Sequence, residues 1–287
     1  MRRFAIACAA LGALCGVALA GVGAASAAPR VLSLDQCADQ YVLALGARGD
    51  IVGLSPRARN ADSWLADRAV GLPILRADAE SALAARPGLV IRYWGGEPKL
   101  LSVLRRRGAT VITLEDAADF DGVRRNVRRV AAALDARAAG EALIGRMDRQ
   151  LAASAGAWRG QRALYLTSGG ATTGPGSLID AMLRAAGLRN LEPAPGYHAL
   201  SLERLTLSPP EAVVAGFFDA GSQAQVHWGP GAHGALKRLL RGRTLVSLPG
   251  GLLGCPAWFA GDAVAMIAHA APAVRCGARA GGHAACA

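Results

Sequence analysis

The chain has 287 residues, and its formal net charge is +11. This length is enough for one large or two medium domains with hydrophobic cores. The charge comes almost entirely from arginine, because Lys99 and Lys237 are the only lysines. The basic residues are spread along the polar faces of predicted helices, as in "RRNVRRV" and "KRLLRGR", so they indicate solvated surface. The composition therefore argues against a nucleic-acid partner.

The first 27 residues have the pattern of a cleaved signal peptide. Arg2 and Arg3 are followed by an uncharged run over residues 4–23 and by the small-x-small pattern Ala25-Ser26-Ala27. We expect cleavage after Ala27 and a periplasmic protein; an uncleaved membrane anchor is the alternative. Loss of Arg2 and Arg3 removes two of the eleven net charges and leaves +9.

Short apolar runs alternate with amphipathic stretches along the remaining chain. This alternation predicts an α/β fold with parallel sheets and helices on both faces. Residues 121–158 carry two helical stripes and almost no strand signal. The predicted strands are 30–34, 51–55, 88–93, 110–115, 162–168, 211–218 and 244–249, and the predicted helices outside 121–158 include 97–109, 177–190 and 234–242.

One segment of the first half is repeated in the second half. "ESALAARPGLVI" begins at Glu80 and "ERLTLSPPEAVV" begins at Glu203, and in each a proline follows the glutamate seven residues later. Each glutamate opens a short helix, which the proline ends before a buried strand. The repeat predicts two similar lobes. We expect a signal peptide at 1–27, lobes at 28–135 and 159–275, a stiff connecting helix at 136–158, a ligand cleft between the lobes and a flexible tail at 276–287.

The chain resembles the class III periplasmic substrate-binding proteins, which deliver cobalamin and ferric siderophores to ABC importers. The similar stretches are "RVLSL", "ALAARPGLVIRYWGG", "LRRRGATVITLED", the long helix and "LSLERLTLSPPEAVV". The resemblance implies a non-catalytic, monomeric protein with two Rossmann-like lobes joined by a backbone helix, and no cofactor of its own. Its cargo, bound between the lobes, would be a chelate of cobalt or iron. The choice between corrinoid, heme and siderophore stays open.

The resemblance also implies one glutamate on each lobe that forms salt bridges with arginines of a dimeric permease in the inner membrane. Glu80 and Glu203 match these positions, and two carboxylates on separate lobes would give a two-point electrostatic contact. The alternative is that each glutamate only stabilises the first turn of its own helix.

Ligand-facing residues are expected at strand ends and in loops, because ligands of open α/β sheets bind at the carboxyl ends of strands. Aromatic residues occupy the positions of Tyr93 and Tyr197 in the cobalamin binders that the chain resembles. His198 is either an axial ligand to heme iron or cobalt, or a solvent-exposed loop residue. No resident metal site is predicted. The expected ligand-binding residues are Cys37, Tyr93, Trp94, Tyr197, His198 and Trp258.

The four cysteines of the mature chain leave several possibilities open. Cys37 and Cys255 both follow strands, so both are expected at the cleft, as a disulfide or as separate lining residues. Alternatively, Cys37 is a reactive thiolate, and the protein is an exported thiol-dependent enzyme that uses Cys37 with His198. Cys276 and Cys286 are candidates for a second disulfide. A third possibility is an interaction module without a small ligand.

Overall fold

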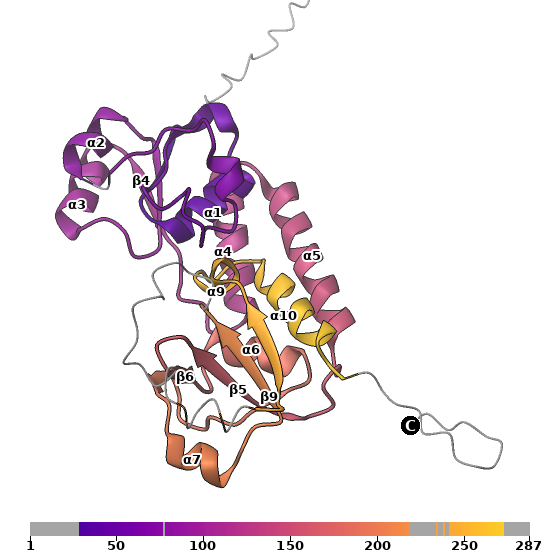
Figure 1. The fold of residues 1–287 in the computed structure, drawn as a ribbon. Coiled ribbons are helices and arrows are strands. Elements are labelled where there is room, and N and C mark those ends of the chain that lie inside the picture. Colours follow the sequence, from indigo (N-terminus) through magenta and orange to yellow (C-terminus); the bar gives the residue numbers. More distant parts are fainter. Residues whose placement is uncertain (1–28, 77, 218–233, 235–237, 239–240, 273–287) are drawn as a thin grey trace, which may run out of the picture.

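The computed structural model describes residues 29–76, 78–217, 234, 238 and 241–272. They form two α/β lobes, each built on a four-stranded parallel sheet, with a pair of helices along one side of both (Figure 1). None of the helices in this part of the chain combines the length and apolarity needed to cross a membrane. The predicted signal peptide, Cys276 and Cys286, and most of the predicted helix 234–242 lie outside the described residues.

The N-terminal lobe contains a sheet of strand order β2-β1-β3-β4. All of its strand pairs are parallel, and residues of β1 and β3 are buried almost completely. Such continuous apolar strands are expected when helices cover both faces of a parallel sheet. The strands are β1 (Val31–Ser33), β2 (Ile51–Gly53), β3 (Leu89–Arg92) and β4 (Thr110–Thr113), and the helices are α1 (Gln36–Leu45), α2 (Ala79–Ala84) and α3 (Pro98–Arg106), with short 3₁₀ turns at Arg48–Asp50 and Ala66–Ala69.

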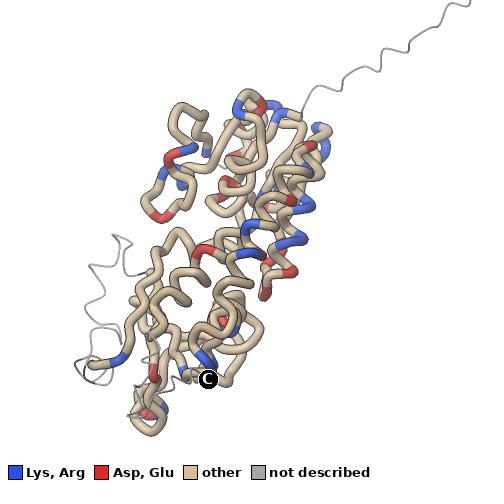
Figure 2. The backbone as a smooth tube through the Cα atoms, turned by 90° about the vertical axis from the view of Figure 1, so that its right-hand side faces the viewer, with Lys and Arg blue, Asp and Glu red and all other residues tan. Residues whose placement is uncertain are grey.

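Two packed helices connect the lobes. They are α4 (Phe120–Ala133) and α5 (Arg137–Ser154), and the chain turns between them with Asp135 at a φ of 51°. The helix predicted at 136–158 is therefore α5. Arg124 bonds Asp148 across the pair, and Arg128 bonds Glu141, so the arginines of "RRNVRRV" are partly neutralised by acids of α5. Figure 2 shows basic and acidic positions together along these helices.

The C-terminal lobe contains a second parallel sheet, of order β10-β9-β5-β7, and a small antiparallel pair, β6-β8. Ser177, the first residue of the helix predicted at 177–190, caps α6 by accepting the amide of Asp180. The strands are β5 (Arg162–Thr167), β6 (Ala171–Thr173), β7 (Arg189–Asn190), β8 (Tyr197–Ala199), β9 (Ala212–Gly216) and β10 (Thr244–Leu248), and the helices are α6 (Leu178–Ala185), α7 (Leu202–Leu207), α9 (Gly250–Leu253) and α10 (Ala260–His269).

The internal repeat corresponds to equivalent elements in the two lobes. In the N-terminal lobe α2 leads into β3, and in the C-terminal lobe α7 leads into β9. Both strands lie inside their sheets, and both helices have six residues. The structure thus confirms the two-lobe architecture predicted from the sequence.

The two lobes share one hydrophobic core. Tyr41 of α1 is fully buried, its hydroxyl donates to the carbonyl of Pro256 at 2.5 Å, and its ring contacts Trp258 edge-on at 5.4 Å. A tilted contact between Trp64 and Phe259 adds a second aromatic link. One buried cluster accordingly contains residues of both lobes and of the helical pair. Lobes joined in this way have little freedom to move apart.

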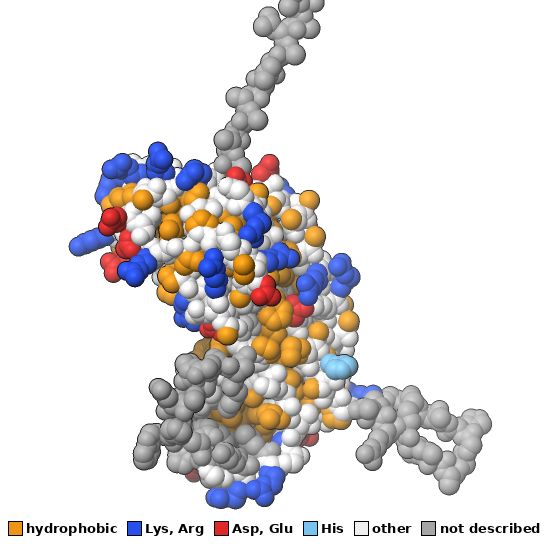
Figure 3. All heavy atoms as spheres, turned by 45° about the horizontal axis from the view of Figure 1, so that its top comes forward, with side chains coloured by type: hydrophobic (Ala, Val, Ile, Leu, Met, Phe, Trp, Pro, Cys, Tyr) orange, Lys and Arg blue, Asp and Glu red, His pale blue; other side chains and the backbone are white. Residues whose placement is uncertain are grey.

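Basic side chains do not form one continuous patch on the face seen in Figure 3. On the N-terminal lobe, Lys and Arg side chains are interspersed with acidic and apolar ones. This distribution matches the interpretation of the positive charge as solvated surface.

Candidate functional site

A cavity of about 380 Å³ lies between the lobes. Most of its walls come from the chain that follows β3 and β4 in one lobe, and from the start of α6 and the chain after β10 in the other. This is the edge at which ligands of parallel α/β sheets bind. The lining residues are Tyr93, Asp116, Ala117, Ala118, Gly176, Ser177, Leu178, Ile179, Met182, Gly196, Tyr197, Leu253, Gly254, Cys255 and Pro256.

Tyr93 is held in the cavity wall by a buried carboxylate. Asp35 Oδ2 accepts the backbone amides of Tyr93, Trp94 and Gly95 at 2.6, 3.1 and 2.8 Å, while Oδ1 caps α1 through the amide of Ala38. A Cβ at Gly95 would lie 2.3 Å from the carbonyl oxygen of Leu34, so only glycine allows this approach. Asp35 therefore ties the loop after β3 to the start of α1.

A carboxylate faces both tyrosines of the cavity. The Tyr93 hydroxyl donates to Asp116 Oδ1 at 2.6 Å. Burial, followed by this hydrogen bond and the charge of Asp116, raises the pKa of Tyr93. Desolvation in the cavity, followed by the charge of Asp116, raises the pKa of Tyr197 as well. Both phenols are consequently neutral at neutral pH in the unliganded protein, and they offer flat faces with polar edges.

Trp94 and Trp258 are not in the walls of this cavity. Trp94 is 56% exposed and lines a separate open depression beside Arg92 and Arg105. Trp258 is only 4% exposed, and it packs in the shared core against Tyr41 and Phe259. The expectation that Trp258 faces the cleft was wrong. Its side chain packs against Tyr41, which is far away in the sequence, and a local sequence pattern does not reveal such a contact.

Cys37 and Cys255 form a disulfide between the lobes, with their Cα atoms 5.2 Å apart. Cys255 lines the cavity, whereas Cys37 is buried and does not. Cys37 therefore acts as half of a crosslink rather than as a lining residue. The thiol-dependent enzyme considered above requires an unpaired Cys37, and the structure contradicts this requirement.

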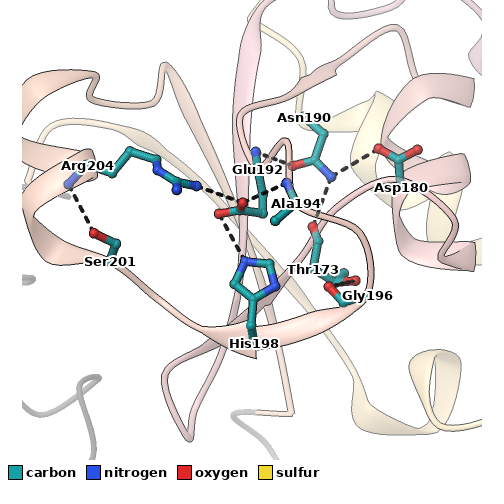
Figure 4. Close-up of polar contacts among 9 residues, drawn as sticks. All are labelled: Thr173, Asp180, Asn190, Glu192, Ala194, Gly196, His198, Ser201 and Arg204. Atoms are coloured by element: carbon teal, nitrogen blue, oxygen red, sulfur yellow. Dashed lines mark hydrogen bonds and ion pairs between the residues drawn. The ribbon is translucent and has the colours of Figure 1, made fainter.

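His198 lies on β8 but does not line the cavity. Its Nε2 lies 3.2 Å from Oε2 of Glu192, whose Oε1 accepts from Arg204 at 2.8 Å (Figure 4). Ligation of a bound metal by Nε2 would have to disrupt this contact. Within the described part of the chain, no three His, Cys, Asp or Glu side chains are grouped as metal ligands.

Glu80 and Glu203 occupy equivalent, exposed places. Each lies in the first turn of its helix, behind a side-chain cap from Asp78 or Ser201. Among the described residues, neither glutamate forms an ion pair. Both carboxylates are thus available to a partner.

Asp116 is a cavity residue that sequence reasoning missed. Asp116 follows "TVITLE", a strand that was predicted correctly, so the strand-end rule that selected Tyr93 could also have selected Asp116.

The fold and the interlobe cavity define a two-lobe binding protein. A family model described as "Periplasmic binding protein" matches residues 31–217, well over half of the chain. The protein therefore belongs to the periplasmic binding protein family, and the class III resemblance is confirmed. No curated protein sequence matches it significantly.

Solved structures of similar proteins share the architecture. The heme-binding protein BhuT, in complex with two hemes, is 27% identical with a TM-score of 0.67, and the match covers 84% of this chain and 97% of BhuT. A heme-binding protein from Pseudomonas aeruginosa is also 27% identical, with a TM-score of 0.64 and coverage of 85% and 92%. The vitamin B12-binding protein BtuF of Vibrio cholerae, at 17% identity and a TM-score of 0.59, shares the fold over 85% of this chain and 96% of its own.

Proposed function

We propose that this protein captures a metal chelate of the heme, corrinoid or ferric siderophore type between its lobes and delivers it to an ABC importer. The observation that carries the proposal is the interlobe cavity with Tyr93 and Tyr197 in its walls. Membership of the periplasmic binding protein family and two heme-binding relatives at 27% identity support it. The proposal includes removal of residues 1–27, a periplasmic location and a monomeric state.

Heme is the first candidate among the three cargoes. Flat aromatic walls with a few polar groups suit a planar macrocycle, because stacking excludes water while the polar groups fix orientation. Capture of a cargo needs no acid–base pair, so binding without catalysis is part of the proposal.

The first test is a titration of the mature protein with hemin, cyanocobalamin and several ferric siderophores. A cargo that binds the native state raises the melting temperature in proportion to the logarithm of its concentration over Kd. We expect one of them to bind with a change in absorbance and a clear thermal shift. Absence of binding by all of them would overturn the proposed function.

Substitutions of the two cavity tyrosines test where the cargo binds. Changing Tyr93 and Tyr197 together to alanine should weaken the affinity by about 100-fold, because buried aromatic contacts dominate binding energies. Tyr93→Phe keeps the ring face, so it should retain most of the affinity. Trp94→Ala removes an aromatic side chain outside the cavity and serves as the matched control, with an expected change within about twofold. A larger effect of Trp94→Ala than of the double variant would place the cargo elsewhere.

Docking on the permease is proposed for Glu80 and Glu203. Their exposure, their equivalent helices and their lack of ion-pair partners among the described residues support a two-point contact with basic residues of a dimer. Changing both to arginine should abolish uptake while cargo affinity stays unchanged.

The control for docking reverses two other exposed acids, Asp67→Arg and Glu97→Arg, which alters the net charge by the same amount. Uptake should survive in this control. Unchanged uptake in the variant with both docking glutamates reversed would refute the docking proposal, even if cargo binding is established.

A further inference from the structure

Glu192 is a buried acid in the loop between β7 and β8, and it lies outside the cavity. Only 5% of the residue is exposed, and a buried carboxylate is costly unless it is paired and hydrogen-bonded. Its Oε1 accepts from Arg204 at 2.8 Å and from the Ala194 amide at 3.0 Å, and its Oε2 lies 3.2 Å from His198 Nε2 (Figure 4). Oε1 therefore has two hydrogen-bond donors, and Oε2 is in contact with the imidazole of His198.

These contacts outweigh the effect of burial on the charge of Glu192. Burial alone would raise its pKa, but the Ala194 amide, His198 and Arg204 bring the pKa below its usual range. The carboxylate is ionised at neutral pH and forms an ion pair with Arg204, while its other oxygen lies against His198.

One partner belongs to the strand that carries Tyr197. Successive side chains of a strand point to opposite sides. Because the His198 side chain points towards Glu192, the side chain of the preceding residue, Tyr197, points away from Glu192. Tyr197 lines the cavity, whereas His198 does not. The strand β8 has three residues and one partner strand, so it has little stability of its own.

The other partner belongs to the helix that carries Glu203. Arg204 follows Glu203 in the first turn of α7. This helix has six residues, and Leu205 is its one buried side chain. A helix this short, with so little buried surface, is not held firmly in position by its own hydrogen bonds and packing. The ion pair to Glu192 supplies a further attachment at the turn that bears Glu203.

We propose that Glu192 is a positioning residue that orients both the cavity residue Tyr197, through His198, and the docking residue Glu203, through Arg204. The inference rests on the proposed function, because it assigns a common support to the proposed cargo wall and the proposed docking helix of the C-terminal lobe.

The test uses three substitutions with two readouts in the mature protein. The first readout is the Kd of hemin or cyanocobalamin, whichever binds more tightly. The second is hydrogen exchange of the amides of Leu205 and Ser208 in and directly after α7, which donate to the carbonyls of Ser201 and Arg204, respectively.

His198→Ala should weaken cargo binding about tenfold and leave exchange in α7 unchanged. Arg204→Met should speed exchange in α7 at least fivefold and leave the Kd within twofold. Glu192→Gln should do both.

The matched control is Asp262→Asn, since Asp262 is another largely buried acid of the C-terminal lobe that is held by an arginine and an amide. Asp262→Asn should lower the melting temperature without changing either readout.

If His198→Ala and Arg204→Met change both readouts equally, or if Glu192→Gln behaves like the control, the positioning role is refuted while the proposed function stands. If the wild-type protein binds no cargo, the proposed function fails first.

Discussion

At the scale of single residues, Asp39 is an acid of the N-terminal lobe whose pKa is shifted by its burial. It is fully buried in α1, where it accepts the amide of Ser55 at 2.9 Å and the hydroxyl of Ser55 at 2.5 Å. Burial is the largest influence, and it raises the pKa of Asp39 to about 7 although hydrogen bonds from Ser55 and Ser33 oppose the rise. The folded protein therefore retains a proton that the unfolded chain releases near pH 4.

This difference predicts a pH-dependent stability. Below about pH 4, Asp39 is protonated in both states. Between about pH 4 and 7 the unfolded state loses its proton first, so this group lowers the free energy of unfolding as the pH rises, by on the order of 4 kcal/mol. Asp39→Asn preserves the shape and removes the titration. The free energy of unfolding of Asp39→Asn, minus that of the wild type, should thus increase from about pH 4 to 7. Urea unfolding of both proteins at several pH values measures this difference.

Comparison with the wild type cancels the contributions of the other carboxylates, which have their own pH dependence. A constant difference between Asp39→Asn and the wild type across this range would show that Asp39 titrates normally.

At the scale of elements, helix α5 contains two glycines with opposite surroundings. A Cβ at Gly140 would lie 2.6 Å from the Cβ of Ala131 in α4, whereas a Cβ at Gly145 would meet only the flexible end of Arg149 at 3.4 Å. Gly140 thus permits the two helices to approach closely, and Gly145 has no such role.

Alanine substitutions at these glycines should change stability in opposite directions. Gly145→Ala should raise the free energy of unfolding by about 0.5–1 kcal/mol, because alanine favours the helix. Gly140→Ala should lower it by about 1–2 kcal/mol, because overpacking outweighs the same helical preference. Chemical unfolding of both variants provides the measurement, and stabilisation by Gly140→Ala would contradict the close packing of α4 on α5.

The sheet strands inside the described ranges were predicted well, because they form continuous apolar runs between turn residues. The strand β7 lay at the end of a stretch assigned to a helix, and its two residues carry little pattern. No strand was predicted at β6 or β8 for the same reason, since three residues are too few to show alternation.

The site was predictable only in part. Tyr93 was selected because it follows a strand and Tyr197 because it precedes the repeated glutamate, and both lie in the walls of the candidate cavity. The location of Trp258 in the core depends on residues far away in the sequence, such as Tyr41, which no local pattern reveals. Glu192 lies only six residues before His198, but their contact depends on how the chain folds between β7 and β8.

At the scale of the whole molecule, the disulfide between Cys37 and Cys255 acts together with the shared core. A crosslink that closes such a long loop restricts the unfolded chain strongly, and a typical native disulfide contributes about 2–4 kcal/mol. Replacing both cysteines with serine should lower the free energy of unfolding by that amount while the lobes stay packed through Tyr41 and Trp258.

Denaturant unfolding checks this loss, and peptide mapping of the unreduced protein should recover Cys37 linked to Cys255. Rapid alkylation of Cys37 in the native protein would contradict the crosslink and would restore the thiol-dependent alternative.

The position of this crosslink in the chain has a consequence for biosynthesis. The two cysteines are 218 residues apart, and ribosomes add roughly 5–20 residues per second. Cys37 is consequently made on the order of 10 to 40 s before its partner exists. During that interval the first lobe can form its sheet, but its thiol has to remain reduced and avoid incorrect pairing. The bond between the lobes can therefore form only after the chain has been made as far as Cys255.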